Sequence, residues 1–404
     1  MNFIKQKFSH SLSACLYLQA LTFIIPLTAH AELSGYLVTE LRYFSSGPLD
    51  SRQQENNVSF ALEPEYFYQS DNTQSLTFKL FARYDQHDNE RSHADIRELM
   101  WIKAADQWEL RAGIGKVFWG VAESQHLVDI INQSDAVENM DLEEKLGQPM
   151  IDLSLIGQYG TFDIFVLPYF RERTFAGSKG RPRAIPYVDT DHVFYQSDKQ
   201  NRHIDYAARW YKSINEWDLG LSYFNGTSRD PRLVAANNNS GETVLQPHYD
   251  LITQTGLDIQ GTFDAWLWKL EVIHRSGVTP AYTAMTGGFE YSFYDIRHTG
   301  ADLGVLLEYM YDNRALNSPG PFQNDILLGL RYTLNDTQST EFLLGQIIDR
   351  HTHASSFNLE ASRRMASNIK LNLEAHYFTR PDTSDPAYVY RDDDYIQAEL
   401  VYYF

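Results

Sequence analysis

The sequence has 404 residues, of which 34 are Lys or Arg and 53 are Asp or Glu, and its net charge is −19 at pH 7. This acidic balance argues against a nucleic-acid partner, because phosphates are neutralised by basic patches. After residue 31, no apolar run reaches the roughly 18 residues that a membrane-spanning helix needs. Yet the sequence contains 26 Tyr, 23 Phe and 7 Trp. A transmembrane β-barrel combines many aromatic residues with modest hydropathy, and a soluble aromatic-rich β-protein is the alternative.

Residues 1–31 are organised like a secretory signal peptide. Lys5 and Lys7 give a positive start, residues 12–27 are mostly apolar, and Ala29-His30-Ala31 fits the small-x-small pattern of a cleavage site. The apolar run is too short and too interrupted to be a membrane anchor. We therefore expect this segment to be removed during export.

The exported domain then spans residues 32–404. Cleavage removes two lysines and no acid, so 32 basic and 53 acidic residues remain, a net charge of −21. It also removes Cys15, the only cysteine, so that no disulfide is available. An alternative is a lipoprotein, because Leu12-Ser13-Ala14-Cys15 resembles a lipidation box. The apolar stretch mostly follows Cys15, however, whereas a lipidation box follows the apolar stretch.

Many segments of the exported domain alternate apolar and polar side chains with a period of two. Such alternation collects the apolar residues on one face of a strand, whereas helical spacing would scatter them. We predict that the apolar rows face lipid. They include Leu76, Phe78, Leu80, Ala82, Tyr84, Trp266, Trp268, Leu270, Val272, Leu303, Val305, Leu307, Tyr309, Tyr311, Ile326, Leu328, Leu330, Tyr332, Ile369, Leu371, Leu373, Ala375 and Tyr377.

The connections between these segments alternate in length. Short polar turns are predicted near residues 69–75, 104–107, 158–161, 212–216, 261–265, 295–300, 334–339 and 365–368. Generally longer loops are predicted near residues 45–57, 86–93, 118–148, 172–201, 225–248, 276–282, 312–323, 350–355 and 380–393. Eight turns and nine loops predict one all-β domain, an antiparallel up-and-down transmembrane barrel of about 18 strands. Sixteen strands is the alternative, because the alternation weakens around 94–103 and 340–349. A barrel of either size leaves an aqueous channel.

The third predicted loop is unusually acidic and unusually apolar. Between Trp119 and Pro149 it carries seven acids and one lysine, together with apolar residues such as Val128 and Ile131. Apolar side chains in a loop must pack against something, and the inner wall of the barrel is the available surface. We therefore predict that residues 119–148 fold inward and form a pore constriction. Its acidic residues are Glu123, Asp129, Asp135, Glu138, Asp141, Glu143 and Glu144.

A basic strip follows in the next predicted loop. If it faced the acidic loop across the pore, the two would set up a transverse field, since rings of charged side chains are how pores select. Two alternatives remain open, namely that the strip braces the acidic loop or binds lipopolysaccharide phosphates outside. The strip consists of Arg171, Arg173, Lys179, Arg181 and Arg183.

Other charged residues fall on the polar rows of the predicted strands. We expect most of them to pair across neighbouring strands rather than to bind solutes, and as a group to keep the lumen wet. The acids among them include Glu271 and Glu308. The predicted basic residues of the lumen wall are Arg83, Arg111, Arg209, Lys269, Arg275 and Arg331.

Signals for an enzyme or a metal site are weak. His351 and His353, with Asp349 nearby, lie in a short predicted connection without a Glu or Cys at metal-ligand spacing. We interpret them as surface histidines. The sequence therefore predicts no cofactor, no metal and no catalytic residue.

The C-terminal segment, Tyr395 to Phe404, reads YIQAELVYYF and alternates throughout. Ile396, Leu400 and Phe404 share one face with the other even-numbered residues, which a barrel would turn toward lipid. A terminal Phe that closes such a strand resembles the signal read by the outer-membrane barrel assembly machinery.

In its layout, nearly the whole exported domain resembles a Gram-negative outer-membrane porin. The resemblance rests on the signal peptide, the alternating strands, the position of the third loop and the terminal Phe404. The Pro-Glu-Phe-Gly-Gly signature of the general porins is absent from the third loop. The resemblance implies passive diffusion of small hydrophilic solutes, residence among the lipid and lipopolysaccharide of the outer membrane, and a possible homotrimer. Alternatives are a specific transporter or exporter of an anionic solute or polysaccharide, an outer-membrane hydrolase, and an adhesive barrel.

Overall fold

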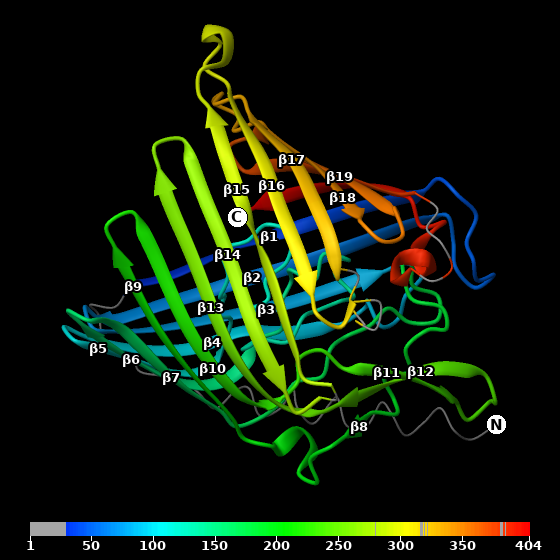
Figure 1. Ribbon diagram of the computed structural model, residues 1–404, viewed down its shortest axis with the longest axis horizontal. Coiled ribbons are helices and arrows are strands. Elements are labelled where there is room, and N and C mark those ends of the chain that lie inside the picture. Colours follow the sequence, from blue (N-terminus) through cyan, green and yellow to red (C-terminus); the bar gives the residue numbers. More distant parts are fainter. Residues whose placement is uncertain are drawn as a thin grey trace.

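The structure, a computed structural model, describes residues 30–278, 280–315, 318, 320, 322–379, 383 and 385–404. The predicted signal peptide lies outside the described residues except for its last two positions, which begin strand β1 (His30–Phe44). The chain forms a wide barrel of tilted antiparallel strands (Figure 1). Its 18 strands are β1 and β2 (Asn56–Asp71), β3 (Gln74–Asp85), β4 (Ala94–Ala105), β5 (Trp108–Gly115), β6 (Gln148–Gly157), β7 (Gly160–Leu167), β9 (Asp205–Ile214), β10 (Trp217–Thr227), β13 (Leu251–Phe263), β14 (Trp266–Ser276), β15 (Tyr282–Phe293), β16 (Asp302–Asp312), β17 (Asn324–Thr333), β18 (Glu341–Asp349), β19 (Ser355–Ala366), β20 (Ile369–Phe378) and β21 (Tyr395–Tyr403).

The barrel closes where the first strand pairs with the last. β1 pairs with β2 on one side and with β21 on the other, and Leu41 lies opposite Ala398. Phe404 extends this pairing, because its backbone N–H donates to Gly35 O and Gly35 N donates back to Phe404 O. Closure leaves no strand edge unpaired, which the interior of a bilayer requires. The predicted antiparallel barrel of about 18 strands is confirmed, and the alternative of 16 is wrong.

Short and long connections alternate as predicted. Eight short turns, together with the chain ends of the barrel, lie at one end, which we call the turn end. Nine connections, most of them longer, lie at the other, which we call the loop end. A separate three-stranded sheet forms there from β8 (Phe194–Tyr195), β11 (Arg232–Asn237) and β12 (Thr243–Tyr249). The described short helices are η1 (Gln200–Arg202), η2 (Ile296–His298) and η4 (Pro386–Tyr390). Within the described residues, no helix has the length and apolarity needed to span a bilayer.

The outer face of the barrel carries the predicted apolar rows. In β1, Leu37 and Leu41 are exposed on the outside, while Val38, Glu40 and Arg42 between and beside them are buried inside. The same alternation exposes Trp268 on β14 and buries the neighbouring Glu271. Further predicted outward residues that are exposed on this face are Leu80, Tyr84, Leu307, Tyr311, Leu328, Leu330, Tyr332, Leu373, Tyr377, Ile396, Leu400 and Tyr402.

The two segments with weak alternation are strands with identifiable irregularities. In β4 the register with β3 shifts, so that Lys79 lies opposite Glu98 and Leu80 lies opposite Ile96. The extra residue is Arg97, and such a bulge interrupts the period of two. In β18 both faces are apolar, with Phe342 and Leu344 exposed outside.

Candidate functional site

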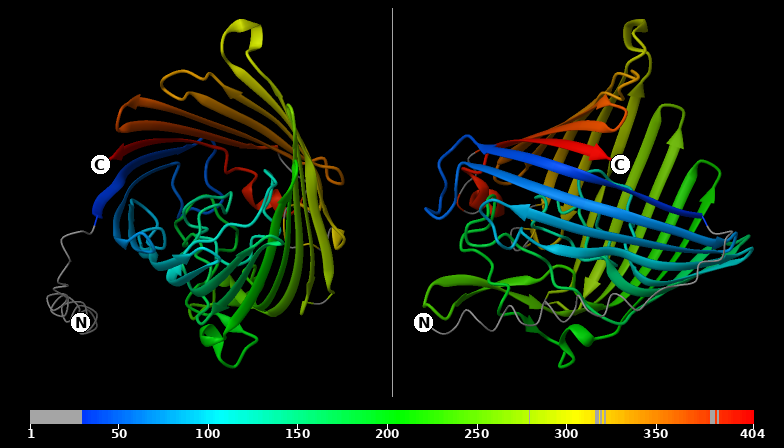
Figure 2. Two further views of the ribbon diagram at one scale, coloured as in Figure 1. Left: turned by 90° about the vertical axis from the view of Figure 1, so that its left-hand side faces the viewer. Right: turned by 180° about the vertical axis from the view of Figure 1, so that it is seen from behind.

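The third connection of the loop end, residues 116–147, lies inside the barrel, and we call it the inner loop. In Figure 2, left, the cyan and teal loop segments run within the ring of strands. Backbone amides of the loop bind a carboxylate on the inner wall. Val121 N and Ala122 N donate to Glu271 Oε1 over 2.7 and 3.0 Å, and Val128 N donates to its Oε2 over 3.1 Å.

A second wall carboxylate binds the same stretch of loop. Glu123 N lies 2.9 Å from Glu308 Oε1, and Ser124 N lies 2.8 Å from Glu308 Oε2. Glu271 and Glu308 are therefore exceptions to the expectation that most charged wall residues pair across neighbouring strands. An irregular backbone carries amides without partners, and buried amides must be satisfied, so the wall carboxylates serve the loop instead.

Apolar side chains of the inner loop pack against the wall beside these carboxylates. Val128, Ile130 and Ile131 are 0–2% exposed and share one cluster with inward-facing residues. Trp119 meets Phe165 of β7 edge to face, with ring centroids 5.6 Å apart. The wall residues of this cluster are Met100, Met150, Phe165, Leu167, Ala207, Phe224, Ile252, Ile273, Tyr282 and Ala284. Apolar residues on the inner face are thus part of a core that the loop completes.

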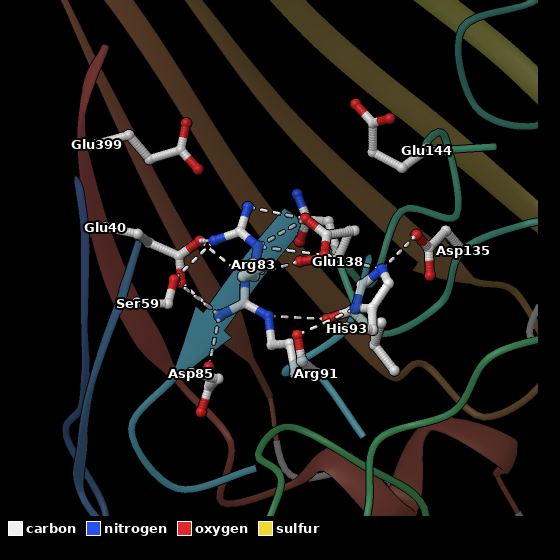
Figure 3. Close-up of polar contacts among 12 residues, drawn as sticks. Glu40, Ser59, Arg83, Asp85, Arg91, His93, Asp135, Glu138, Glu144 and Glu399 are labelled. Atoms are coloured by element: carbon white, nitrogen blue, oxygen red, sulfur yellow. Dashed lines mark hydrogen bonds and ion pairs between the residues drawn. The ribbon is translucent and has the colours of Figure 1, made fainter. Parts of the chain in front are cut away.

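At its other side the inner loop is held by a buried ion network (Figure 3). Glu40 of β1 is 1% exposed and accepts from Arg91 Nη1 and Nη2, each over 2.7 Å, and from Arg83 Nη1 over 3.0 Å. Arg83 also binds Glu138 of the loop over 2.7 Å, and Arg91 Nε donates to Val137 O. The network therefore joins β1, β3 and the connection before β4 to the inner loop.

Asp135 forms the second part of this network. It lies 2.5 Å from Arg97 Nη2 and 3.3 Å from His93 Nε2, and its Oδ1 accepts from Thr174 Oγ1 over 2.5 Å. Burial alone would raise the pKa of Asp135, but His93, Arg97 and Thr174 hold that pKa well below its usual value. His93 is affected in turn, because Asp135 and the nearby Glu138 raise the pKa of His93 although burial acts to lower it.

His93, Asp135 and Glu138 place their ligand atoms within 4.8 Å of one another, a spacing that a metal ion could use. Each carboxylate, however, already binds a guanidinium, Arg97 in one case and Arg83 in the other. A cation added there would face two fixed positive charges. The donor set therefore fits an ion network better than a metal site.

The predicted constriction residues divide into two groups. Asp129, Asp135 and Glu138 have side chains only 0–5% exposed, and Asp129 lies 3.2 Å from Lys145 Nζ. Burial raises the pKa of Asp129 in spite of that lysine. These three cannot line an open passage, so the expectation that they face the pore is wrong, because the loop turns them toward its own anchors.

The other four acids, Glu123, Asp141, Glu143 and Glu144, reach the lumen. Glu123 is partly exposed and binds Arg331 over 2.8 Å and Lys269 over 3.4 Å. Partial burial acts to raise the pKa of Glu123, but Arg331 and Lys269 lower it overall. Asp141, Glu143 and Glu144 are exposed.

The basic strip binds acidic and carbonyl groups at the loop end. Arg171 lies 2.8 Å from Asp95, and Arg173 lies 2.7 Å from Asp230. Arg181, 7% exposed, binds Asp393, and Arg183, 4% exposed, binds Asp50. Lys179 is exposed, and no ion pair links it to a described residue. The expectation that Arg181 and Arg183 face the pore is wrong, because their guanidinium groups are buried between loops. These two arginines hold other connections of the loop end together and make no hydrogen bond or ion pair with the acidic loop. The strip residues that brace the inner loop are Arg171, which donates to Gly147 O, and Arg173, which donates to Gln133 Oε1.

The predicted wall cations all lie on inward-facing positions. Arg209 binds Asp258 over 2.7 Å and lies 5.2 Å from the ring centroid of Trp119. Arg275 binds Asp230 of a loop over 2.8 Å, and Arg111 binds Glu109 over 2.6 Å. Arg83, Lys269 and Arg331 all bind acids of the inner loop.

The role of four further residues in holding the inner loop was not predicted from the sequence, namely Glu40, Arg91, His93 and Arg97. Glu40 stands on the polar row of an alternating strand, a signal that could have indicated its inward position. His351 and His353 lie in the connection 350–354, where His353 N donates to Asp349 O. Within the described residues, neither histidine is near enough to further metal-ligating groups to form a candidate metal site.

Comparisons with known proteins complete the description. No protein-family model and no curated protein matches the sequence. Among solved structures, a BenF-like porin from Pseudomonas fluorescens Pf-5 has a TM-score of 0.54 and 11% identity, covering 94% of this chain and 99% of that chain. A loop-deletion mutant of OmpT, an outer membrane protein of Vibrio cholerae, has a TM-score of 0.47 and 9% identity, covering 93% and 99%. A mutant of the Rh. blastica porin has a TM-score of 0.45 and 12% identity, covering 93% and 100%. With its closed ring of 18 strands and its likeness to the BenF-like porin, the chain has the antiparallel β-barrel fold of an outer-membrane porin.

Proposed function

We propose that the protein is a channel of the Gram-negative outer membrane through which small hydrophilic solutes diffuse passively. The observation that supports this proposal most directly is that the inner loop crosses the barrel and is anchored on both sides. Glu271 and Glu308 bind it on one side, and Arg83 and Arg91 bind it on the other. A barrel of 18 strands is too wide to be filled by wall side chains. We propose that a loop fixed in this way narrows the lumen and leaves a passage beside it.

The same proposal includes the route to the membrane. Residues 1–31 direct export and are cleaved, and the domain 32–404 is then inserted by the barrel assembly machinery. Phe404 is exposed on the outer face beside the seam between β1 and β21, where that machinery could reach it. Lipid then contacts the apolar rows, and lipopolysaccharide surrounds the loop end. A homotrimer is compatible with these contacts.

Reconstitution in planar lipid bilayers tests the channel. We expect discrete, voltage-independent conductance steps from the purified protein without any added ligand. An absence of current from folded protein would refute the proposal. A pore that stays closed until one anionic polymer opens it would instead indicate an exporter.

Releasing the inner loop should change the current. In a Glu271→Ala/Glu308→Ala variant, five backbone amides lose their acceptors, and each unsatisfied buried donor costs about 1–3 kcal/mol. We expect a larger and noisier single-channel conductance.

The matched control for this variant is Asp106→Ala/Glu216→Ala. Both residues are exposed in turns at the turn end, so the control also removes two carboxylates but lies away from the inner loop. The control should keep the steady current of the unmodified protein. An unchanged current in the double variant would show that the loop does not limit conductance.

A further inference from the structure

Nearly all arginines near the inner loop are withdrawn from the passage. Arg91 and Arg97 have side chains 5% and 2% exposed and bind Glu40 and Asp135. Arg229, 3% exposed, binds Asp205 and the backbone oxygen of Ile131. Other arginines of the wall and loops with side chains 2–13% exposed, each in an ion pair, are Arg83, Arg173, Arg181, Arg183, Arg209 and Arg275. A buried guanidinium neutralised by a carboxylate attracts few anions in the lumen.

Four of the seven carboxylates of the inner loop, by contrast, remain accessible, namely Glu123, Asp141, Glu143 and Glu144. The side chains of Glu143 and Glu144 are 65% and 56% exposed, and their nearest basic groups are His126 at 3.9 Å and Lys116 at 3.6 Å. In Figure 3, Glu144 projects away from the ion network, with no contact drawn to it. Exposed pairs at such distances screen each other weakly and leave most of the carboxylate charge facing water.

The wall opposite this part of the loop is also acidic. Asn139 Nδ2 donates to Glu374 Oε2 of β20 over 3.3 Å, so the tip of the loop reaches the wall. Asp141 and Glu143 lie close enough to Glu360 and Glu374 for their charges to interact. Glu360 is exposed, and its side chain has no hydrogen bond or ion pair with another described residue.

Two accessible cations lie on the same wall. Arg331 binds Glu123 over 2.8 Å and Glu290 over 3.4 Å, so that two carboxylates share one guanidinium. It lies, together with Lys370, beside a cavity of about 240 Å³ on this wall. The acids that line the same cavity are Glu341, Glu360 and Glu374. Acids therefore outnumber bases along the wall as well as on the loop.

From two independent observations, the burial of most arginines in ion pairs and the accessibility of carboxylates on both sides of the passage, we infer that the channel selects small cations, including protonated amines, over anions. The inference rests on the proposed function, because selectivity requires a conducting pore. The burial of Arg181 and Arg183 weakens the positive side of the transverse field that the sequence suggests. The accessible charge around the passage is then predominantly negative in spite of Arg331 and Lys370, and a predominantly negative passage concentrates cations.

The pKa of Asp141 gives a further, pH-dependent result. This carboxyl is open to the lumen, yet protein surrounds it, and burial together with Glu143 and Glu374 raises the pKa of Asp141 to about 6. The other charged groups near it are Glu360 and His376. Lowering the pH from 7.5 to 5 removes the charge of Asp141, so the cation-to-anion permeability ratio should fall. Asp141→Asn should reduce this pH dependence when reversal potentials are measured at both pH values.

The decisive experiment measures reversal potentials across a planar bilayer that separates concentrated from dilute KCl. For the unmodified protein, we expect the sign set by K⁺. Each accessible carboxylate that is neutralised should lower the permeability ratio about two- to threefold, the factor expected for one charge about 6–10 Å from the ion path in water. Glu360→Gln/Glu374→Gln and Glu143→Gln test the wall and the loop separately. Glu216→Gln, in an exposed turn at the turn end, is the control of equal charge change and should leave the ratio unchanged.

The outcomes separate the two proposals. A steady current with a reversal potential set by Cl⁻, or one that these substitutions leave unchanged, overturns cation selection and leaves the channel intact. Absence of any current from the folded protein overturns the channel itself. A ratio that falls with each substitution and stays constant in Glu216→Gln supports cation selection. Replacing KCl with the chloride of a small primary amine then extends the test to organic cations.

Discussion

Replacing Glu40 with alanine should lower the free energy of unfolding by about 3–5 kcal/mol, the usual cost of breaking a buried ion pair from one side. Glu40 is 1% exposed and receives three hydrogen bonds, of 2.7, 2.7 and 3.0 Å, from Arg91 and Arg83. Arg42 lies 3.8 Å away and is also buried. Removal of this carboxylate leaves guanidinium groups close together without their shared counter-charge. Equilibrium urea unfolding of the refolded protein in detergent micelles or liposomes, followed by tryptophan fluorescence, measures the change.

One comparison variant separates the network from a general effect of charge. Glu65→Ala removes a carboxylate that binds Lys79 over 3.0 Å with both side chains about one third exposed, and it should change stability by less than about 1 kcal/mol. In Glu40→Ala, the loss of a fixed partner for Arg83 and Arg91 should also loosen the inner loop. A stability loss as small as that of Glu65→Ala would show that the network does not hold the barrel and the loop together.

An arginine at Leu373 should destabilise the barrel by about 2–4 kcal/mol if this position lies near the middle of the bilayer. Leu373 is the fifth of the ten residues of β20, and it is 41% exposed on the outer face. Its cross-strand partners, Ala361 of β19 and Ala398 of β21, are small and offer no acceptor for a guanidinium. Lipid offers none either, so the charge must be buried without a partner or pull the membrane interface toward it.

The neighbouring position supplies the matched control. Asn372 faces the lumen, where its side chain donates to Glu399, and Asn372→Arg places the new charge among acids and water. We expect folded protein in normal amounts from the control and reduced accumulation in the outer membrane from Leu373→Arg. The same urea titration quantifies the difference. Equal stability of the two variants would contradict the assignment of the outer face.

The number of strands and the outer face of the barrel were predictable from sequence because they depend on local order. A period of two assigns side chains to alternate faces, whatever the strand pairs with, and turn residues separate one strand from the next. The inward position of the third loop followed similarly, since Val128 and Ile131 in a connection require a surface to cover. The bulge at Arg97 was hidden, because an extra residue interrupts the very period on which the prediction relies.

The partners of the charged residues were decided only by the tertiary structure. Arg181 binds Asp393, 212 residues away along the chain, and Glu123 binds Arg331, 208 residues away. Such pairs exist only after the barrel has closed and the loops have packed, and many carboxylates in the sequence could have served each arginine equally well. Burial then neutralised some charges and left others in water, so the acidic and basic segments lost the simple opposition that their sequences suggested. The alternation of apolar and polar side chains depends only on residues that are neighbours in the sequence. The sign of the charge that faces the lumen depends instead on which distant groups the closed fold brings together.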